Sequence, residues 1–466
     1  MTAAAPSTFE VLDPATLAVI DSVPDQGPDD ARAAVDSAAA ALGPWGALTP
    51  RARSEILTRV HGLMLRDRDR LAAMISAENG KSLTDATGEV TYAAEFFRWF
   101  AEEAVRPGGE YGESPNGGTR TIVRHGPVGV AALVTPWNFP AAMATRKIAP
   151  ALAAGCTVVL KPASETPLTA LAVAELLTEA GLPDGVVNVV TTTDAGAVVG
   201  TWLKDERVRK VSFTGSTGIG RVLLHQAADR VLNASMELGG NAPFVVTEDA
   251  DVDAAVAGAM IAKFRGGGQA CTAANRFFVH AAVHDEFVAK FGAEVEKLSV
   301  GAAADGCTIG PLISEAARER VERVVAEAET AGARVTHRAA SPDSSQGYFV
   351  DPRVLVDVAP DSAIVAEEIF GPIAPIIRWD DEARMLEQVN SSEFGLAAYV
   401  YAGELGRALR LGEAIEAGMV GINRGLVSDP SAPFGGMKQS GLGREGAREG
   451  LREFQETQYL SVDWPG

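Results

Sequence analysis

Short apolar runs that alternate with amphipathic stretches most constrain the fold of this 466-residue chain. From Val128 onward, strand-like and helix-like segments follow one another, which predicts a parallel, doubly wound sheet with right-handed crossovers. Ligands of such sheets bind outside the carboxyl ends of the strands. The predicted strands are residues 130–134, 157–160, 186–190 and 210–213, and the predicted helices are residues 149–154, 170–180 and 218–228.

A second α/β unit is predicted from about Ala242 to about Asn423. A chain of this length exceeds one ordinary hydrophobic core, so two or three domains are expected. The strands predicted in this second unit are residues 243–246, 276–280, 374–377 and 398–401. We therefore expect an α/β protein with two doubly wound domains.

The first hundred residues are predicted to be helical and to cover one face of a sheet. Thr49 is a predicted N-cap, Pro50 follows at the first helical position, and apolar residues then recur at helical spacing. Segment 119–123 is predicted as a strand of an extended arm that has no core of its own, so it must lie against another part of the structure. The apolar residues of segment 457–462 predict a terminal strand.

Composition argues against several classes of protein. The net charge of −20 at pH 7 argues against a nucleic-acid partner. No run of about eighteen apolar residues occurs, so a membrane span is not expected, and the N-terminus does not resemble a signal peptide. Cys156, Cys271 and Cys307 are too widely separated for a disulfide framework or a metal cluster. We therefore expect a cytoplasmic protein without a metal site.

The segment from Phe264 to Cys271 combines three consecutive glycines with a thiol. A glycine backbone can approach a ligand closely, and a thiolate is a nucleophile when its pKa is lowered. A lone cysteine among small residues is more often a buried apolar side chain. Here Glu237 in MELGGN adds a carboxylate, and Asn138 in PWNFP adds an amide donor. A thiol, a carboxylate and an amide together indicate an acyl-transfer site.

Seven separated motifs extend this pattern along the chain. They are PWNFP at Pro136, KPAS at Lys161, FTGSTGIG at Phe213, ELGG at Glu237, GQAC at Gly268, EEIFGP at Glu367 and PFGGMKQSG at Pro433. Any one of these motifs is weak evidence of a relationship to a known family, whereas seven of them in the same order are strong evidence. From about Val11 to the C-terminus, the chain resembles the NAD(P)-dependent aldehyde dehydrogenases, and within them it is most similar to succinate-semialdehyde dehydrogenases.

The resemblance implies a particular domain organisation. It comprises a dinucleotide-binding domain, a catalytic domain that carries the cysteine, and a small β arm through which subunits form a homodimer or homotetramer. The expected boundaries are residues 1–118 and 131–241 for the first domain, 242–430 for the second, and 119–130 with 440–466 for the arm.

The resemblance also implies three catalytic roles. Cys271 attacks an aldehyde to give a thiohemiacetal, and the Asn138 amide together with the Cys271 N–H stabilises the oxyanion. After hydride transfer to nicotinamide, Glu237 activates the water that hydrolyses the thioester. Two alternatives stay open at this point: Asn138 caps a strand-to-helix turn, or Glu237 is a solvated loop residue.

The cofactor positions are matched by several motifs. The segment from Gly215 to Gly220 follows a predicted strand and opens a helix, so its N–H groups can hold a pyrophosphate, although it is not a GxGxxG fingerprint. Lys161 and Ser164 match positions that contact the adenine ribose. Many NAD-preferring members have Glu where this chain has Ser164, so these two residues predict a preference for NADP, with NAD as a second cofactor. The other matching positions are Trp137, Ser216, Leu238, Glu368 and Phe370.

Substrate recognition is assigned to two arginines. Arg146 and Arg265 match the residues with which semialdehyde dehydrogenases hold a distal carboxylate, and Ser428 is placed to add a hydroxyl. Succinate semialdehyde is thus the expected small-molecule substrate. The alternative is that either arginine is an ordinary surface or helix-end residue.

Three departures from the family pattern are present. Gly266 and Gly267 stand where semialdehyde members often have Asn-Thr, Ala273 leaves no second cysteine for a local disulfide switch, and Arg424 occupies a position where a small neutral residue is expected. The competing functions are oxidation of another short-chain or glutarate-type semialdehyde, a cofactor-independent thiol esterase, and a catalytically silent member.

Overall fold

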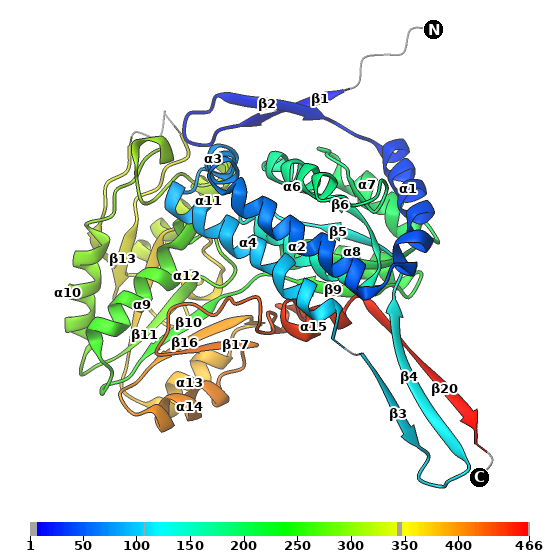
Figure 1. Ribbon diagram of the computed structural model, residues 1–466. Coiled ribbons are helices and arrows are strands. Elements are labelled where there is room, and N and C mark those ends of the chain that lie inside the picture. The colour runs from blue at the N-terminus through cyan, green and yellow to red at the C-terminus, as the bar shows by residue number, and fades with distance from the viewer. Residues whose placement is uncertain (1–6, 107, 343–346, 465–466) are drawn as a thin grey trace.

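The computed structural model describes residues 7–106, 108–342 and 347–464. Two sheets, each covered by helices, form the body of the molecule, and a three-stranded arm projects from it (Figure 1). The predicted class of two α/β domains with a small β arm is confirmed. The N-terminal residues considered for a signal peptide, which also begin the 1–118 segment, lie outside the described residues.

The first sheet has six strands in the order β19-β9-β8-β5-β6-β7. All neighbouring pairs are parallel except β19 with β9. Strands β5 and β6 are buried throughout, as expected for Val-rich runs inside a parallel sheet. The strands are β5 Val130–Val134, β6 Thr157–Lys161, β7 Val187–Val189, β8 Val208–Thr214, β9 Asn233–Glu237 and β19 Gly441–Leu442.

The helices of this domain include one that begins much earlier than its sequence predicts. Helix α5 starts at Pro140, not at Ala149, and every one of its residues is buried. A helix that is buried all round has no polar face, so its periodicity could not reveal its start. The other helices that accompany this sheet are α6 Pro167–Glu179, α7 Ala195–Lys204 and α8 Thr217–Ala228.

The N-terminal region is helical only after an antiparallel hairpin, β1 Thr8–Leu12 with β2 Val19–Pro24, which was not predicted from the sequence. The predicted cap is present, because Thr49 Oγ1 accepts a hydrogen bond from Ala52 N. Helix α4 packs against α2 and α5 through a core that includes Phe96, Phe97 and Phe100. The helices are α1 Pro28–Ala47, α2 Pro50–Arg66, α3 Arg68–Asn79 and α4 Leu83–Ala104.

The second sheet has seven strands in the order β12-β13-β14-β11-β10-β16-β17, parallel except for β12. The strands are β10 Ala242–Val246, β11 Ala274–His280, β12 Arg334–Arg338, β13 Arg353–Val356, β14 Ile373–Trp379, β16 Ala397–Tyr401 and β17 Met419–Ile422. The longer helices around it are α9 Val252–Phe264, α10 His284–Val295, α11 Glu315–Thr330, α13 Glu382–Asn390 and α14 Leu405–Ala414.

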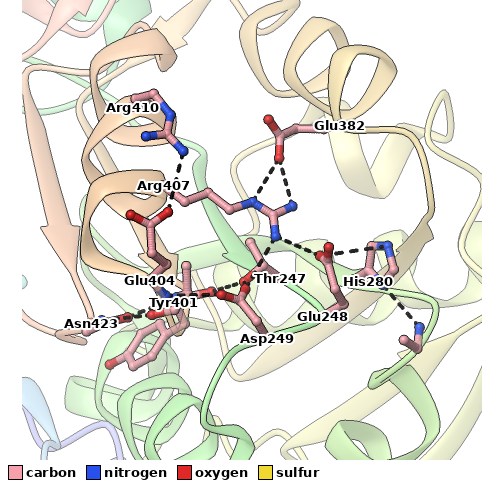
Figure 2. Close-up of polar contacts among 12 residues, drawn as sticks. Thr247, Glu248, Asp249, His280, Glu382, Tyr401, Glu404, Arg407, Arg410 and Asn423 are labelled. Carbon is pink, nitrogen blue, oxygen red and sulfur yellow. Dashed lines mark hydrogen bonds and ion pairs between the residues drawn. The ribbon is translucent and has the colours of Figure 1, made fainter.

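A network of polar contacts around Arg407 lies at the carboxyl ends of β10 and its neighbouring strands (Figure 2). The Arg407 guanidinium lies 3.0 Å from Glu248 and 3.4 Å from Asp249, and it donates to Glu382 at 2.8 Å. Strand β11 begins after Cys271 and runs away from it, so this network and the thiol lie at opposite ends of the strand, about 20 Å apart. The network therefore joins α13 and α14 to the sheet without touching the cysteine.

The arm is built from three antiparallel strands in the order β20-β4-β3. The boundaries of the arm differ from those predicted from the sequence, which were residues 119–130 and 440–466. The arm also contains β3, and it does not contain the segment 440–452. In that segment β19 joins the first sheet, and helix α15 Ala447–Arg452 packs against α4 and α5 with Leu451 buried. The arm strands are β3 Gly109–Glu113, β4 Thr119–Pro127 and β20 Gln455–Asp463.

Helices that combine the length and the apolar composition needed to cross a membrane do not occur in the part of the chain that the structure describes.

Candidate active site

A cavity of about 420 Å³ between the two domains collects residues from motifs that are far apart in the sequence. Its lining includes two residues predicted to be catalytic, Asn138 and Cys271. It also includes six residues predicted to hold the cofactor, namely Trp137, Gly215, Ser216, Leu238, Glu368 and Phe370. The remaining predicted residues (Lys161, Ser164, Glu237, Arg146, Arg265 and Ser428) are not part of this lining.

The glycine run shapes the loop that carries the thiol. After α9 ends at Phe264, Gly266, Gly267 and Gly268 adopt positive φ angles of 60°, 65° and 77°. A Cβ on Gly268 would collide with the carbonyl oxygen of Gly371, so a side chain cannot fit there. The Gly266 N–H donates to the Asp85 carboxylate at 2.9 Å, which ties the loop to the start of α4.

The environment of Cys271 favours the neutral thiol. The side chain is partly exposed, yet burial, with a smaller contribution from the Glu368 carboxylate, raises the pKa of the Cys271 thiol to about 12. The Arg146 guanidinium acts in the opposite direction. Because an ordinary cysteine pKa is about 8.5, the thiol is protonated at neutral pH and needs a proton acceptor before it can attack.

Glu237 lies at the end of β9 and is 3% exposed, which excludes the solvated-loop alternative. Burial raises the pKa of Glu237 well above its ordinary range, and the neighbouring Glu445 carboxylate raises it further. Within the described residues, its Oε2 atom has no hydrogen-bond partner. A buried carboxyl group with raised proton affinity and an unused oxygen has the properties of a general base.

Arg146 and its neighbour Lys147 are buried behind Glu237. Both pair with Glu445: Arg146 Nε lies 3.3 Å from one carboxylate oxygen, and Lys147 Nζ lies 2.5 Å from the other. The Arg146 guanidinium also donates to the Tyr92 hydroxyl at 2.7 Å and stacks 4.0 Å from the Phe434 ring. Arg146 is thus an interior residue with an anionic partner of its own, and not a surface arginine.

Arg265 is in a different situation. Its guanidinium carbon lies 5.2 Å from the centre of the Phe139 ring. Burial raises the pKa of Tyr399, whose hydroxyl donates to the carbonyl of Thr272, and the positive charge of Arg265 counteracts part of that rise. Among the described residues, Arg265 forms no ion pair or side-chain hydrogen bond. The structure therefore places a half-buried, unpaired cation beside the nucleophile loop. Ser428 is half-buried in the loop that follows β17.

Asn138 follows β5 at the entrance to α5. Its side-chain Nδ2 donates to the carbonyl of Gln269 at 3.0 Å, two residues before the thiol. The capping alternative does not hold, because the N-cap of α5 is Phe139 and Glu89 accepts hydrogen bonds from the N–H groups of Ala141 and Ala142. An amide nitrogen carries two hydrogens, so one remains for a ligand at the thiol.

The turn from β8 to α8 fits the diphosphate of a dinucleotide. Ser216 is the N-cap of α8 and accepts a hydrogen bond from Ile219 N at 3.4 Å, and this helix N-terminus opens on the cavity. Gly215 has no room for a side chain, because a Cβ there would collide with the Phe213 ring. The positive end of the helix and the absence of a side chain suit a phosphate.

Glu368, which also lines the cavity, accepts a hydrogen bond from Gly240 N at 3.0 Å, and burial raises the pKa of Glu368 to about 7. The rings of Trp137 and Phe370 meet edge to face, with their centroids 5.5 Å apart. Lys161, at the end of β6, is 7% exposed, and burial lowers its pKa. Ser164 Oγ donates to Glu165 at 3.2 Å, and Glu165 lines the cavity.

Several residues of this region were not found by sequence reasoning: Lys81, Glu89, Lys147, Glu165 and Glu445. A signal for some of them existed, because Arg146 and Lys147 are the only charged residues in the otherwise apolar segment 140–154. Buried charges require partners. The partner itself could not be read from the sequence, because Glu445 lies 298 residues after Lys147.

The chain was compared with protein families and with known proteins. Residues 1–460 match the model of the aldehyde dehydrogenase family. The chain is 51% identical to a succinate-semialdehyde dehydrogenase of Paenarthrobacter nicotinovorans, over 94% of this chain and 97% of the relative. It is 49% identical to a glutarate-semialdehyde dehydrogenase of Pseudomonas aeruginosa, over 98% and 94% of the two chains.

A solved structure described as an E. coli NADP-dependent enzyme superposes with a TM-score of 0.96 at 49% identity, covering 98% of this chain and 95% of the other. Family model, relatives and structure all extend over nearly the whole chain. Together with the thiol and the buried carboxyl group, they show that this protein is an oxidoreductase that belongs to the aldehyde dehydrogenase family.

Proposed function

We propose that this protein oxidises succinate semialdehyde to succinate with NADP or NAD as the hydride acceptor. The observation that carries the choice of substrate is Arg265, a half-buried guanidinium next to the nucleophile loop that has no anionic partner among the described residues. An unpaired cation at that position suits a substrate whose far end is a carboxylate. The names of relatives that match the chain agree with this choice.

In the proposed reaction, the Cys271 thiol gives its proton to the Glu237 carboxylate, which passes it on to solvent, and the sulfur bonds to the aldehyde carbon. The resulting oxyanion is stabilised by the free Asn138 amide hydrogen and the Cys271 N–H. A dinucleotide held by Ser216, Glu368 and Phe370 would supply the acceptor for the hydride that leaves this carbon, and a thioester of Cys271 would remain. Glu237 then removes a proton from the water that attacks the thioester, which releases the acid and the thiol.

The two remaining substrate residues have distinct proposed roles. Arg146 forms an ion pair with Glu445, so its guanidinium is not free to bind a substrate carboxylate with two hydrogen bonds. Its main proposed contribution is the positive potential that it creates at Cys271. Ser428 adds a hydroxyl near the carboxylate end. Arg265 is therefore the principal carboxylate-binding residue in this proposal, with Arg146 and Ser428 in support.

For the cofactor, we propose that NADP is preferred and that NAD is also used. Lys161 has no carboxylate within ion-pair distance among the described residues, so its charge is available to a 2′-phosphate, and Ser164 supplies a hydroxyl. Glu165 opposes this preference, because its carboxylate is hydrogen-bonded to Ser164 and its negative charge acts on Lys161, where it offsets part of the lowering of the pKa by burial.

Replacing Glu165 by Gln removes a negative charge from this corner while keeping a hydrogen-bond acceptor for Ser164. We expect the affinity for 2′,5′-ADP to rise about 3- to 10-fold and the affinity for 5′-AMP to stay within about twofold, since one screened charge pair is worth about 1 kcal/mol. Calorimetric titration of both ligands measures this. Glu175→Gln is the matched control, because Glu175 is exposed on α6, the helix that begins two residues after Glu165. Equal gains for both ligands would contradict the role of Glu165.

We further propose that the arm joins subunits into a homodimer or homotetramer. Large apolar side chains are exposed on its strands, and they are Tyr111, Ile122, Tyr459 and Leu460. The three cysteines are free thiols, which suits the reducing cytoplasm as the place of action.

The test of the substrate proposal is a set of initial rates with succinate semialdehyde, glutarate semialdehyde, butanal and propanal, each with NADP and with NAD. The highest kcat/KM is expected for succinate semialdehyde. Glutarate semialdehyde is the second candidate, because a relative of similar identity bears that name and one cation does not by itself fix the chain length. Faster oxidation of the uncharged aldehydes would remove the carboxylate-binding role of Arg265. A thiol esterase would leave these aldehydes unchanged and would release acid from an ester substrate without any nicotinamide.

A further inference from the structure

A buried ion pair lies directly beneath the loop that carries Asn138, and none of the roles described so far uses it. Lys81 Nζ lies 2.5 Å from Glu89 Oε2, and the two side chains are 1% and 0% exposed. Lys81 follows the C-terminal end of α3, and Glu89 lies in the second turn of α4. Removing two charges from water is costly, and a pair like this adds little net stability compared with an apolar pair of the same size. Its position therefore calls for another explanation.

Lys81 and Asn79 hold the backbone on both sides of Asn138. Lys81 Nζ donates to the carbonyl oxygen of Asn138 at 2.7 Å. The Asn79 side-chain amide donates to the carbonyl oxygen of Trp137 at 3.0 Å. The peptide groups before and after the Asn138 α-carbon are thus fixed by two residues that are almost adjacent in sequence.

The residue between these two donors explains why both can reach the loop. Gly80 ends α3 in the left-handed conformation, with φ of 87°, and a Cβ there would lie 2.7 Å from Pro311. The turn that it allows directs Asn79 and Lys81 to the same loop. A side chain at position 80 would both strain the turn and collide with its surroundings.

Glu89 completes the arrangement by linking it to α5. Its Oε2 atom pairs with Lys81, and its Oε1 atom accepts hydrogen bonds from Ala141 N at 2.9 Å and Ala142 N at 3.3 Å. One carboxylate thus fixes both the lysine under Asn138 and the first turn of the helix that follows Asn138. With the hydrogen bond from Asn138 Nδ2 to Gln269, the amide has little freedom left.

We propose that Asn79, Lys81 and Glu89 are positioning residues that hold the Asn138 amide where an oxyanion forms at Cys271. The inference rests on the oxyanion role of Asn138 in the proposed function. A misplacement of about 1 Å in such a site can lower the rate about 100-fold, so this pair influences catalysis without touching substrate or cofactor.

Two reactions of the Cys271 thiol distinguish a loss of positioning of the Asn138 amide from a general disturbance of the site. Acylation of Cys271 by p-nitrophenyl acetate passes through an oxyanion, whereas alkylation by iodoacetamide displaces iodide and forms none. Lys81→Met combined with Glu89→Gln removes the pair without leaving a buried charge, and the side-chain oxygen of the introduced glutamine still accepts hydrogen bonds from α5. We expect acylation to fall about 10- to 100-fold while alkylation stays within about twofold.

A double-mutant cycle with Asn138→Ala shows whether the pair acts through Asn138. Asn138→Ala alone should slow acylation about 100-fold. Adding the Lys81→Met and Glu89→Gln changes to it should lower the rate by no more than about a further twofold, because the positioned group is already absent. Should the Lys81/Glu89 variant not fold, Asn79→Ala takes its place in the cycle with an expected effect of about 3- to 10-fold, an order-of-magnitude figure for one lost positioning hydrogen bond.

The matched control is Arg407→Met with Glu382→Gln, which removes one positive and one negative charge from the network in Figure 2. Both reactions of the thiol should keep their rates in this control. If the Lys81/Glu89 variant and Asn138→Ala slow acylation by factors that simply multiply, the positioning role is overturned. If Asn138→Ala slows acylation and the Lys81/Glu89 variant does not, the positioning role is overturned, while the oxyanion role of Asn138 is retained. If Asn138→Ala leaves acylation unchanged, the oxyanion role in the proposed function falls, and this inference falls with it.

Discussion

The molecule contains two networks of charged residues in which the carboxyl pKa values shift in opposite directions. In the exposed network around Arg407, hydrogen bonds to the guanidinium lower the pKa of Glu248, and a hydrogen bond from Thr247 lowers that of Asp249. In the buried network behind Cys271, burial and a second carboxylate raise the pKa of Glu237. The first network satisfies its charges, as a structural element does.

The buried network leaves polar atoms unused. In the described part of the chain, Glu237 Oε2 and Asn138 Oδ1 are buried without a hydrogen-bond partner, whereas Arg146 Nε and Glu445 Oε2 form an ion pair with each other. Unsatisfied buried groups cost stability, and raised carboxyl pKa values cluster at functional sites. The comparison teaches that charges which stabilise a fold are paired, whereas charges that serve a reaction are left incomplete.

The largest expected effect comes from the thiol that the buried network surrounds. Cys271→Ala should abolish aldehyde oxidation, because no other described nucleophile lies at that point of the cavity. Binding of the cofactor, followed by fluorescence titration, should stay close to that of the unmodified protein, as the change removes one sulfur atom. Substantial surviving turnover would remove Cys271 as the nucleophile.

Glu237→Gln tests whether the buried carboxyl group is kept for chemistry at the expense of stability. The rate of thioester hydrolysis should fall about 10²- to 10⁴-fold. The pKa of Glu237 is raised in the folded state, so its contribution to stability is present below the unfolded value, near 4.5, and is lost as pH rises through the folded value.

The Glu237→Gln variant should therefore unfold at a higher denaturant concentration than the unmodified protein at about pH 8, and the gain should disappear at about pH 4. Equilibrium denaturation at the two pH values measures this difference. A loss of stability at the higher pH would place Glu237 among the paired, structural charges.

Arg265→Gln removes a cation of the nucleophile loop that has no ion-pair partner among the described residues. We expect KM for succinate semialdehyde to rise about 10- to 100-fold, and KM for butanal to change less than about threefold, because only the first substrate has a carboxylate to lose a charge-assisted hydrogen bond of about 1.5–3 kcal/mol. Steady-state kinetics with both aldehydes provide the measurement. Glu413→Gln, an exposed charge change on α14, serves as the control.

The smallest effect on activity is expected in the exposed network. Arg407→Met should lower the free energy of unfolding by about 1 kcal/mol, since its side chain is partly exposed and its ion pairs are screened. The stabilisation that Glu248 and Asp249 provide exists above their ordinary pKa values and is lost as pH falls through their lowered ones. The difference between the two proteins should thus shrink at about pH 3, and kcat should stay within about twofold at any pH.

The order of residues alone was enough to predict the fold class, most of the core strands and the family. Runs such as 130–134 and 157–160 are apolar throughout, and a strand inside a covered parallel sheet needs that composition. Motifs such as the glycine run before Cys271 are local, so their residues keep their relation to one another in any structure that forms. The chain order of seven such motifs therefore predicted the family.

The roles of the charged residues became visible only in the folded protein. From the sequence, Arg146 was predicted to be a substrate-binding residue, but the structure shows it paired with Glu445. The segment 78–89 was predicted to be helical scaffold, but the structure places the Lys81–Glu89 ion pair against the backbone of Asn138. The proton affinities of Glu237 and Cys271 depend on burial and on charges brought from other motifs. Pairing and desolvation arise from contacts between residues far apart in the chain, and the order of residues does not contain those distances.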